Sequence, residues 1–220
     1  RNGYYGGIRL LQALCHKFHE YCTEHKGLML PPKAFTLAYE TNIPKQAGLS
    51  GSSAIICAGL KCLMEYYEVS DKLPKVELPS LILSVEADLG ITAGLQDRVI
   101  QVYEGVVFMD FDETKMKADG YGTYVPLPPV QLPPLYLVYS ENPGDSGKAH
   151  STVKQRWLDG DPLVHHGMAD VAKVAVQGRR ALEDGDFAAL VSLMNRNFSL
   201  RRQMYGDAAL GALNIRMVTI

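Results

Sequence analysis

The sequence predicts an α+β fold divided into two domains. Amphipathic helical patterns and short β-rich runs are mixed along the first half, without the regular alternation of a parallel α/β sheet. The second half is helical in most of its pattern. Between the two halves, residues 112–134 become polar and then proline-rich, which is typical of a domain boundary. We therefore expect one domain over residues 1–130 and another over residues 131–220.

The first domain is expected to combine helices with a few strands. Apolar residues recur at steps of three and four from Gly7 until the Pro31-Pro32 pair, which indicates an amphipathic helix and its end. Alternation of apolar and other residues over 35–39 indicates a half-buried strand. The further expected elements are a helix through 55–66, a helix around 78–89, a short helix over 95–103 and a strand over 106–111.

The second domain is expected to begin with a strand and continue as helices. Leu135–Tyr139 is an apolar run, as in a buried strand. The turn residues Asn142-Pro143-Gly144 then precede helical patterns over roughly 149–158, 163–184, 187–204 and 207–220.

Composition excludes several classes of protein. The 220 residues carry a net charge of −2, with the charges interspersed, so the chain has no general attraction to nucleic acid or to an acidic membrane. No apolar run approaches the roughly 20 residues of a membrane-spanning helix, and no signal peptide is visible. The spacing of Cys15, Cys22, Cys57 and Cys62 fits neither a zinc site nor a redox pair, which favours a reduced, cytoplasmic location. Oligomeric state is not indicated.

A loop rich in glycine and serine lies between the strand predicted over 35–39 and the next helix. Glycines let a backbone approach a ligand closely, and serines at a helix start offer hydroxyls beside unpaired amides, as in an anion or magnesium site. It is not a Walker A loop, since no Lys-Ser or Lys-Thr pair follows the glycines. The plainer interpretation is a serine that caps the helix. The loop reads Ile43-Pro44-Lys45-Gln46-Ala47-Gly48-Leu49-Ser50-Gly51-Ser52-Ser53-Ala54.

Two acidic residues flank a second loop. Glu86 ends one predicted helix, the loop Gly90–Gly94 follows, and Asp97 begins the next helix. Such a pair could supply a metal ligand and a general base. The alternative is a solvated Glu and an Asp in the favourable first turn of a helix.

Together and in this order, the two motifs resemble those of the GHMP kinases. The resemblance implies a two-domain fold, with a ribosomal-protein-S5-like N-terminal lobe and a ferredoxin-like, helix-rich C-terminal lobe. It implies ATP and Mg²⁺ as cofactors, Glu86 with Ser53 (or Ser52) as magnesium ligands, and Asp97 as the catalytic base. The residues implied at the ATP phosphates are Pro44, Gly48, Leu49, Ser50, Gly51, Ser52, Ser53 and Ala54. The loop is one residue longer than the shortest family form, which leaves the choice between the two serines open.

Longer strings resemble the plant-type glucuronokinase branch of that superfamily, among them Ala93–Arg98 and Glu141–Thr152. That branch implies a sugar 1-kinase acting on glucuronate, whose carboxylate needs a cation. The candidates are Arg98, Lys148 and Arg156, each of which could instead be an ordinary surface charge or structural ion pair. Another sugar kinase, of galactose or fucose type, and a non-catalytic sensor of nucleotide or sugar remain as alternatives.

The first and third motifs of the superfamily are not found in the sequence. We therefore expect that the chain is cut from a longer protein and is inactive alone.

Overall fold

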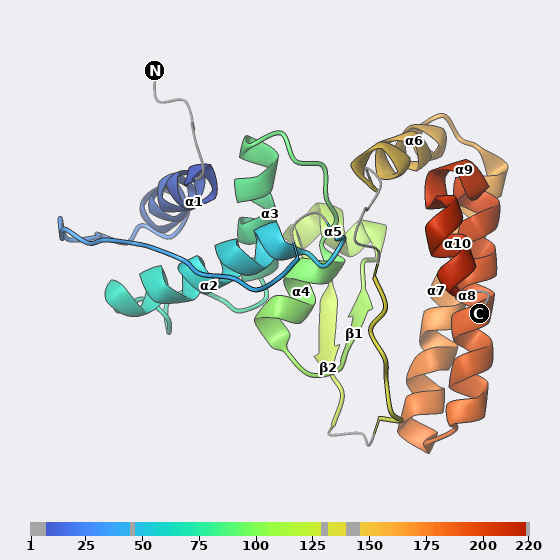
Figure 1. The fold of residues 1–220 in the computed structure, drawn as a ribbon. Coiled ribbons are helices and arrows are strands. Elements are labelled where there is room, and N and C mark those ends of the chain that lie inside the picture. The colour runs from blue at the N-terminus through green and yellow to red at the C-terminus, as the bar shows by residue number, and fades with distance from the viewer. Residues whose placement is uncertain (1–7, 45–46, 129–131, 140–145, 219–220) are drawn as a thin grey trace. The chain divides into compact units, whose positions relative to one another are not determined.

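The computed structural model describes residues 8–44, 47–128, 132–139 and 146–218 (Figure 1). The chain divides after Pro126 into two compact units, whereas the sequence predicted a division after residue 130. Each unit is described by itself below.

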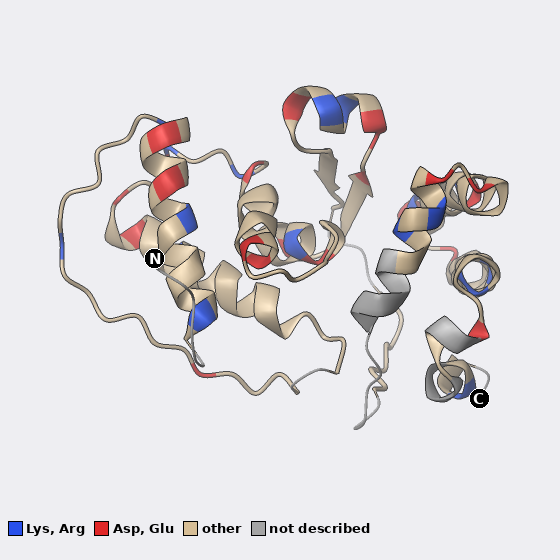
Figure 2. Ribbon diagram, turned by 90° about the horizontal axis from the view of Figure 1, so that it is seen from above, with Lys and Arg blue, Asp and Glu red and all other residues tan. Residues whose placement is uncertain are grey.

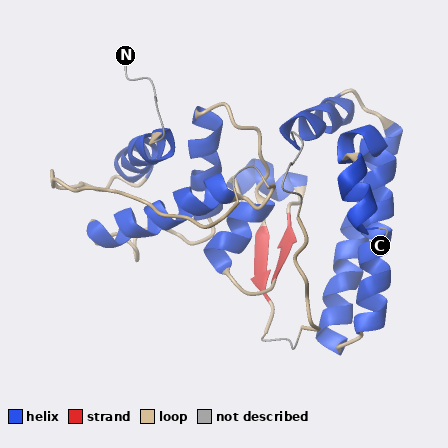
Figure 3. Cartoon of the chain, viewed as in Figure 1, coloured by secondary structure: helices blue, strands red, loops and turns tan. Residues whose placement is uncertain are grey.

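The first unit is mostly helical, with one small sheet (Figure 3). β1 and β2 are antiparallel, and Val107 lies opposite Pro126. The elements are α1 (Arg9–Glu20), the π-helical turn η1 (Tyr21–His25), α2 (Gly51–Tyr66), α3 (Leu78–Asp88), α4 (Gln96–Tyr103), β1 (Val107–Asp110), α5 (Glu113–Asp119) and β2 (Thr123–Pro126).

The core of this unit lies where α1, α2 and α3 meet. Each helix places an apolar stripe there, which confirms the helical periodicity predicted for these segments. A glycine allows the close approach of α1 and α2, because a Cβ at Gly59 would lie 2.6 Å from Cδ2 of Leu14. Side chains that are almost completely buried include Leu14, Phe18, Ile56, Leu60, Ile82 and Val85.

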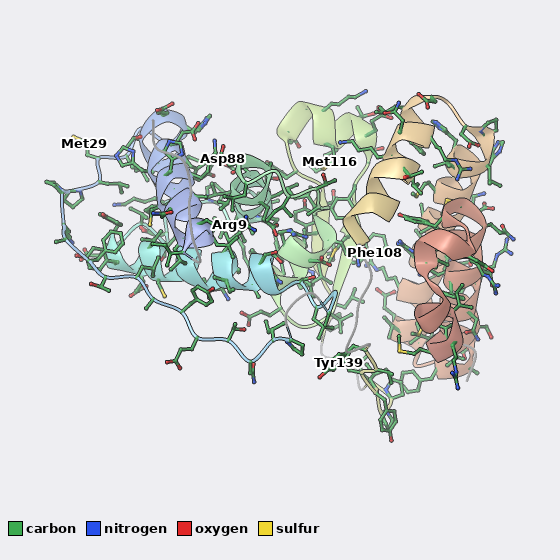
Figure 4. All side chains as sticks on the ribbon, turned by 45° about the horizontal axis from the view of Figure 1, so that its top comes forward. Arg9, Met29, Asp88, Phe108, Met116 and Tyr139 are labelled. Carbon is green, nitrogen blue, oxygen red and sulfur yellow. The ribbon has the colours of Figure 1, made fainter. Side chains whose placement is uncertain are left out.

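The strand predicted over 35–39 is wrong, since residues 27–44 form neither helix nor strand. A strand needs a partner for its backbone groups, and the only strand pairing among the described residues joins β1 to β2. Contacts with α2 take its place. The ring of Phe35 packs edge-on against Tyr66 at 5.4 Å, and the hydroxyl of Tyr66 donates to the carbonyl of Ala34 at 2.9 Å. Met29, labelled in Figure 4, is 95% exposed.

The region 112–134 holds two elements that composition did not predict. Asp112 caps α5 by accepting a hydrogen bond from the amide of Lys115, and Gly120 ends the helix with a φ of 78°. β2 then follows. The polar composition of this stretch therefore marks a short capped helix and an edge strand.

The second unit is helical throughout its described secondary structure. α7 and α8 form a hairpin whose turn contains Gly185 at a φ of 68°, and aspartates 161 and 186 cap the two helices. The strand predicted over 135–139 is wrong, because these residues adopt no regular structure and their side chains are exposed. The elements are α6 (Ser146–Leu158), α7 (Pro162–Asp184), α8 (Phe187–Tyr205), α9 (Asp207–Leu210) and α10 (Ala212–Val218).

Charged residues of both signs are distributed over the helices (Figure 2). Within the described part of the chain, no helix combines the length and the apolar character needed to cross a membrane.

Candidate active site

The serine loop enters α2 through a left-handed residue. Ser50 has a φ of 54°, which is uncommon for a residue other than glycine. Its carbonyl oxygen accepts hydrogen bonds from the amide of Ala54 at 3.0 Å, the hydroxyl of Ser53 at 3.0 Å and the side-chain amide of Gln101 at 3.2 Å. These contacts fix the direction in which the chain enters the helix.

The start of α2 has the properties of an anion site. No side chain of the described residues caps the helix, and the first amides of an α-helix have no partner within it. These donors and the positive end of the helix dipole favour a phosphate group. Gly48 turns the chain before the helix with a φ of 72°. Pro44 accepts a 3.5 Å hydrogen bond from Ala47, while residues 45–46 lie outside the described part of the chain.

Glu86, in the last turn of α3, reaches the start of α2. The hydroxyl of Ser52 donates to Oε1 of Glu86 at 2.7 Å. The carboxylate is completely buried. Ser53 is also completely buried, but its hydroxyl points back to Ser50. The structure therefore places Ser52, rather than Ser53, against the acidic residue.

Arg98 of α4 holds the other oxygen of the Glu86 carboxylate. Its Nε donates to Oε2 at 2.6 Å, and its Nη2 contacts the same oxygen. Its Nη1 donates to the carbonyl of Gly94 at 2.9 Å and to Oδ2 of Asp97 at 3.2 Å. The arginine side chain is only 5% exposed. Arg98, predicted as a candidate for the substrate's carboxylate, thus has its guanidinium engaged inside the protein.

Asp97 lies in the first turn of α4 and has a more open environment. Its side chain is 42% exposed, in contrast to the buried Glu86. Ser52, Glu86, Arg98 and Asp97 therefore form one continuous series of polar contacts, although they come from three helices. The two motifs that the sequence singled out lie together in the fold.

Gln101 belongs to this group and was not predicted from the sequence. It lies one turn after Arg98 on α4, and its Nε2 holds the Ser50 carbonyl. Its Oε1 is buried and is without a hydrogen-bond partner among the described residues. Its spacing from Arg98 is the signal in the sequence that could have found it, since residues three apart share a helix face. The thiol of Cys57 donates to the Gln101 carbonyl at 3.6 Å, and burial raises the pKa of that thiol.

The oxygens beside the serine loop fit a magnesium ion. Magnesium binds oxygen ligands at about 2.0–2.1 Å in octahedral geometry, so neighbouring ligands lie about 2.9 Å apart. Ser52 Oγ and Glu86 Oε1 are 2.7 Å apart, close to that spacing. Magnesium in phosphate-transfer sites usually takes only one or two protein ligands, and the nucleotide and water supply the rest.

The other predicted cations lie in the second unit. Arg156 donates from Nε to Asp161 at 2.8 Å and from Nη1 to the carbonyl of Met204, so it ties α6 to the start of α7 and the end of α8. The side chain of Lys148 lies outside the described part of the structure.

Comparison with known proteins identifies relatives along the whole chain. Residues 9–105 match the GHMP kinases N terminal domain. The chain is 55% identical over 220 residues to probable glucuronokinase 2 and 52% identical over 218 residues to glucuronokinase 1, both of Arabidopsis thaliana. These alignments cover 100% and 99% of the chain and 60% of each relative, so the chain spans about 60% of the length of these curated relatives.

A more distant relative is D-glycero-alpha-D-manno-heptose 7-phosphate kinase of Campylobacter jejuni. It is 24% identical over 178 residues, which cover 80% of the chain and 52% of the relative. No solved structure matches the chain significantly.

Proposed function

We propose, from the match of residues 9–105 to the GHMP kinases N terminal domain, that the protein containing this chain is a GHMP kinase and acts as an ATP-dependent sugar 1-kinase. The reaction transfers the γ-phosphate of ATP to the anomeric hydroxyl of D-glucuronate. The product is glucuronate 1-phosphate, a precursor for UDP-sugar synthesis. The substrate assignment rests on the 52–55% identity to two plant glucuronokinases.

One structural observation carries the kinase proposal. The helix start that suits a phosphate, the hydroxyl–carboxylate pair that suits magnesium, and an accessible aspartate are joined by direct contacts. Phosphoryl transfer requires these three groups in one place, because its catalysis consists mainly of positioning and charge stabilisation.

Each residue then has a defined part in the reaction. The amides at the start of α2, with Pro44 and residues 48–54, bind the β- and γ-phosphates. Ser52 and Glu86 hold the metal, in preference to Ser53, whose hydroxyl points back to Ser50. Magnesium, when bound, supplies charge neutralisation between the phosphates. Asp97 accepts the proton of the attacking sugar hydroxyl, which requires a contact of about 2.6–3.2 Å.

The substrate's carboxylate requires a cation beyond those already engaged. Arg98 and Arg156 both use their guanidinium groups within the protein. Lys148 is the remaining predicted candidate, and we propose it as the cation for the substrate's carboxylate. We also propose the two-lobed GHMP architecture for the complete protein, with residues 1–130 in the N-terminal lobe, and a cytoplasmic location.

The direct test is ADP release by the complete protein with ATP, Mg²⁺ and a panel of sugars. We expect turnover with glucuronate and at least roughly tenfold lower kcat/KM with galactose, fucose and galacturonate. Preference for a neutral sugar would replace the substrate assignment with the galactose or fucose type. Binding of ATP and sugar without ADP formation would instead show a sensor.

A further inference from the structure

We propose that Arg98 is a positioning residue that balances the charge of Glu86, so that the divalent metal enters the site together with the nucleotide and not before it. The proposal rests on the proposed kinase function for its nucleotide. The quantity that tests it is the affinity of the protein for a divalent cation without nucleotide, which can be measured without turnover.

The geometry divides the two oxygens of Glu86 between two partners. Oε2 receives both donors of Arg98, and Oε1 receives the hydroxyl of Ser52. A carboxylate held in this way can offer only Oε1 to a metal. Arg98 therefore decides which oxygen faces the serine loop, and it prevents the carboxylate from turning to bind a metal through both oxygens.

Charge in the buried part of the site is already balanced. Glu86 is completely buried, and its partner Arg98 is 5% exposed. Interactions between charges are strong in such surroundings because little water screens them. A hydrated cation approaching Ser52 and Glu86 therefore meets a neutral pair, beside the more exposed Asp97. A cation already bound to the phosphates of ATP brings its own neutralising ligands.

Arg98 also fixes the spacing between the two acidic residues. Its Nη1 binds the Gly94 carbonyl, at the end of the loop between α3 and α4, and reaches Asp97. Because one planar guanidinium makes all these contacts, a lysine could supply the charge but not the fork of donors.

The test measures Mn²⁺ binding by electron paramagnetic resonance in the complete protein, with Mn²⁺ alone and with a non-hydrolysable ATP analogue. We expect weak binding of Mn²⁺ alone to the unmodified protein and much tighter binding with the analogue. Arg98→Met leaves the charge of Glu86 without its neutralising partner. The affinity of this variant for Mn²⁺ alone should therefore rise at least roughly tenfold. A merely structural role for Arg98 predicts no such gain.

Three further variants complete the experiment. Glu86→Gln combined with Arg98→Met removes both charges and should abolish the gain. Arg202→Met removes an arginine paired with Asp207 in the second unit and should leave Mn²⁺ binding unchanged. Arg98→Lys retains the charge but not the fork of donors. Mn²⁺ alone should therefore still bind weakly, while the KM for Mg²⁺ rises. This variant tests the proposal if Arg98→Met does not fold.

The proposal is overturned if folded Arg98→Met binds Mn²⁺ alone no better than the unmodified protein, or if Arg98→Lys has an unchanged KM for Mg²⁺. Failure of the kinase proposal looks different. In that case no sugar on the panel gives ADP, whatever the Mn²⁺ affinities are.

Discussion

Ser52 and Glu86 are 34 positions apart in the chain, yet the serine hydroxyl donates to the glutamate carboxylate at 2.7 Å. The contact joins the first turn of α2 to the last turn of α3. It separates two adjacent serines that the sequence cannot distinguish, because Ser53 directs its hydroxyl to the carbonyl of Ser50.

The two serines should therefore respond differently to alanine. Ser52→Ala removes a proposed metal ligand, and we expect kcat to fall roughly 10²-fold with a higher requirement for Mg²⁺. Ser53→Ala should affect mainly stability, since it removes a buried hydroxyl and its hydrogen bond to the Ser50 carbonyl. Steady-state kinetics against Mg²⁺ concentration in the complete protein compares them. A larger kinetic loss in Ser53→Ala would return the metal to that residue.

Asp97→Asn should abolish most turnover and leave ATP binding nearly intact. The substitution keeps the size of the side chain and removes its ability to accept a proton, which is worth about 10²–10⁴-fold in rate. Single-turnover kinetics and calorimetric ATP binding measure the two effects separately. Rates like those of the unmodified protein would remove Asp97 from the proposed mechanism.

The residue that binds the substrate's carboxylate can be identified by comparing variants of Lys148 and Arg156. Lys148→Met should raise the KM for glucuronate roughly 10–100-fold, the value of a hydrogen bond to a charged group. Arg156→Gln should lower the melting temperature, because it breaks the contacts with Asp161 and Met204, without a comparable change in KM. The reverse pattern would make Arg156 the substrate residue.

The close contact of α1 and α2 can be tested with two glycines. Gly59→Ala places a methyl group 2.6 Å from Leu14 and should destabilise the protein by about 1–3 kcal/mol. Gly178→Ala is the matched control, since it lies inside α7 and no described residue comes within 4 Å of an added Cβ. Helix propensity alone should make it more stable by about 0.5–1 kcal/mol. Urea unfolding measures the change in the free energy of unfolding for both variants. Equal changes would contradict the close contact of α1 and α2.

Stability should depend on pH through Glu77. Burial opposes the charge of this carboxyl, but hydrogen bonds from Lys26 and Tyr21 outweigh burial and hold its pKa below the ordinary value of 4.5. A lowered pKa in the folded state stabilises the protein above pH 4.5, and this contribution is lost as the pH falls through the folded-state pKa.

Glu77→Gln should therefore lower the free energy of unfolding by about 1–2 kcal/mol at pH 7, and the difference should shrink progressively below pH 4.5. Urea titrations at several pH values measure it. Glu113→Gln, which breaks an exposed pair with Lys117, is the control and should have little effect at any pH. A difference for Glu77→Gln that does not change with pH would contradict the expectation.

Helices in this chain could be predicted from sequence more reliably than strands. A helix satisfies its backbone internally, so the periodicity of α1 or α7 is sufficient information. The alternation at 35–39 and the apolar run at 135–139 carry no information on a partner strand, and neither segment forms a strand. β2 was missed because its surroundings are polar and rich in proline.

The residues of the candidate site were singled out from the sequence, whereas the contacts between them were not. Ser52, Glu86, Asp97 and Arg98 were all singled out from two short motifs. The contact of Arg98 with Glu86 depends on how α3 and α4 pack, which no local pattern encodes. For the same reason Gln101, whose partner is 51 positions away, was not predicted.

α4 has only eight residues, and a helix of that length does not persist in water by itself. Its buried valines, with Arg98 and Gln101, hold it against the rest of the unit. The position of Asp97 therefore depends on the contacts of α4 with α3 and with the start of α2. In rising denaturant, catalytic competence should disappear before the bulk of the helical signal does, and the amides of α4 should exchange with solvent earlier than those of α2.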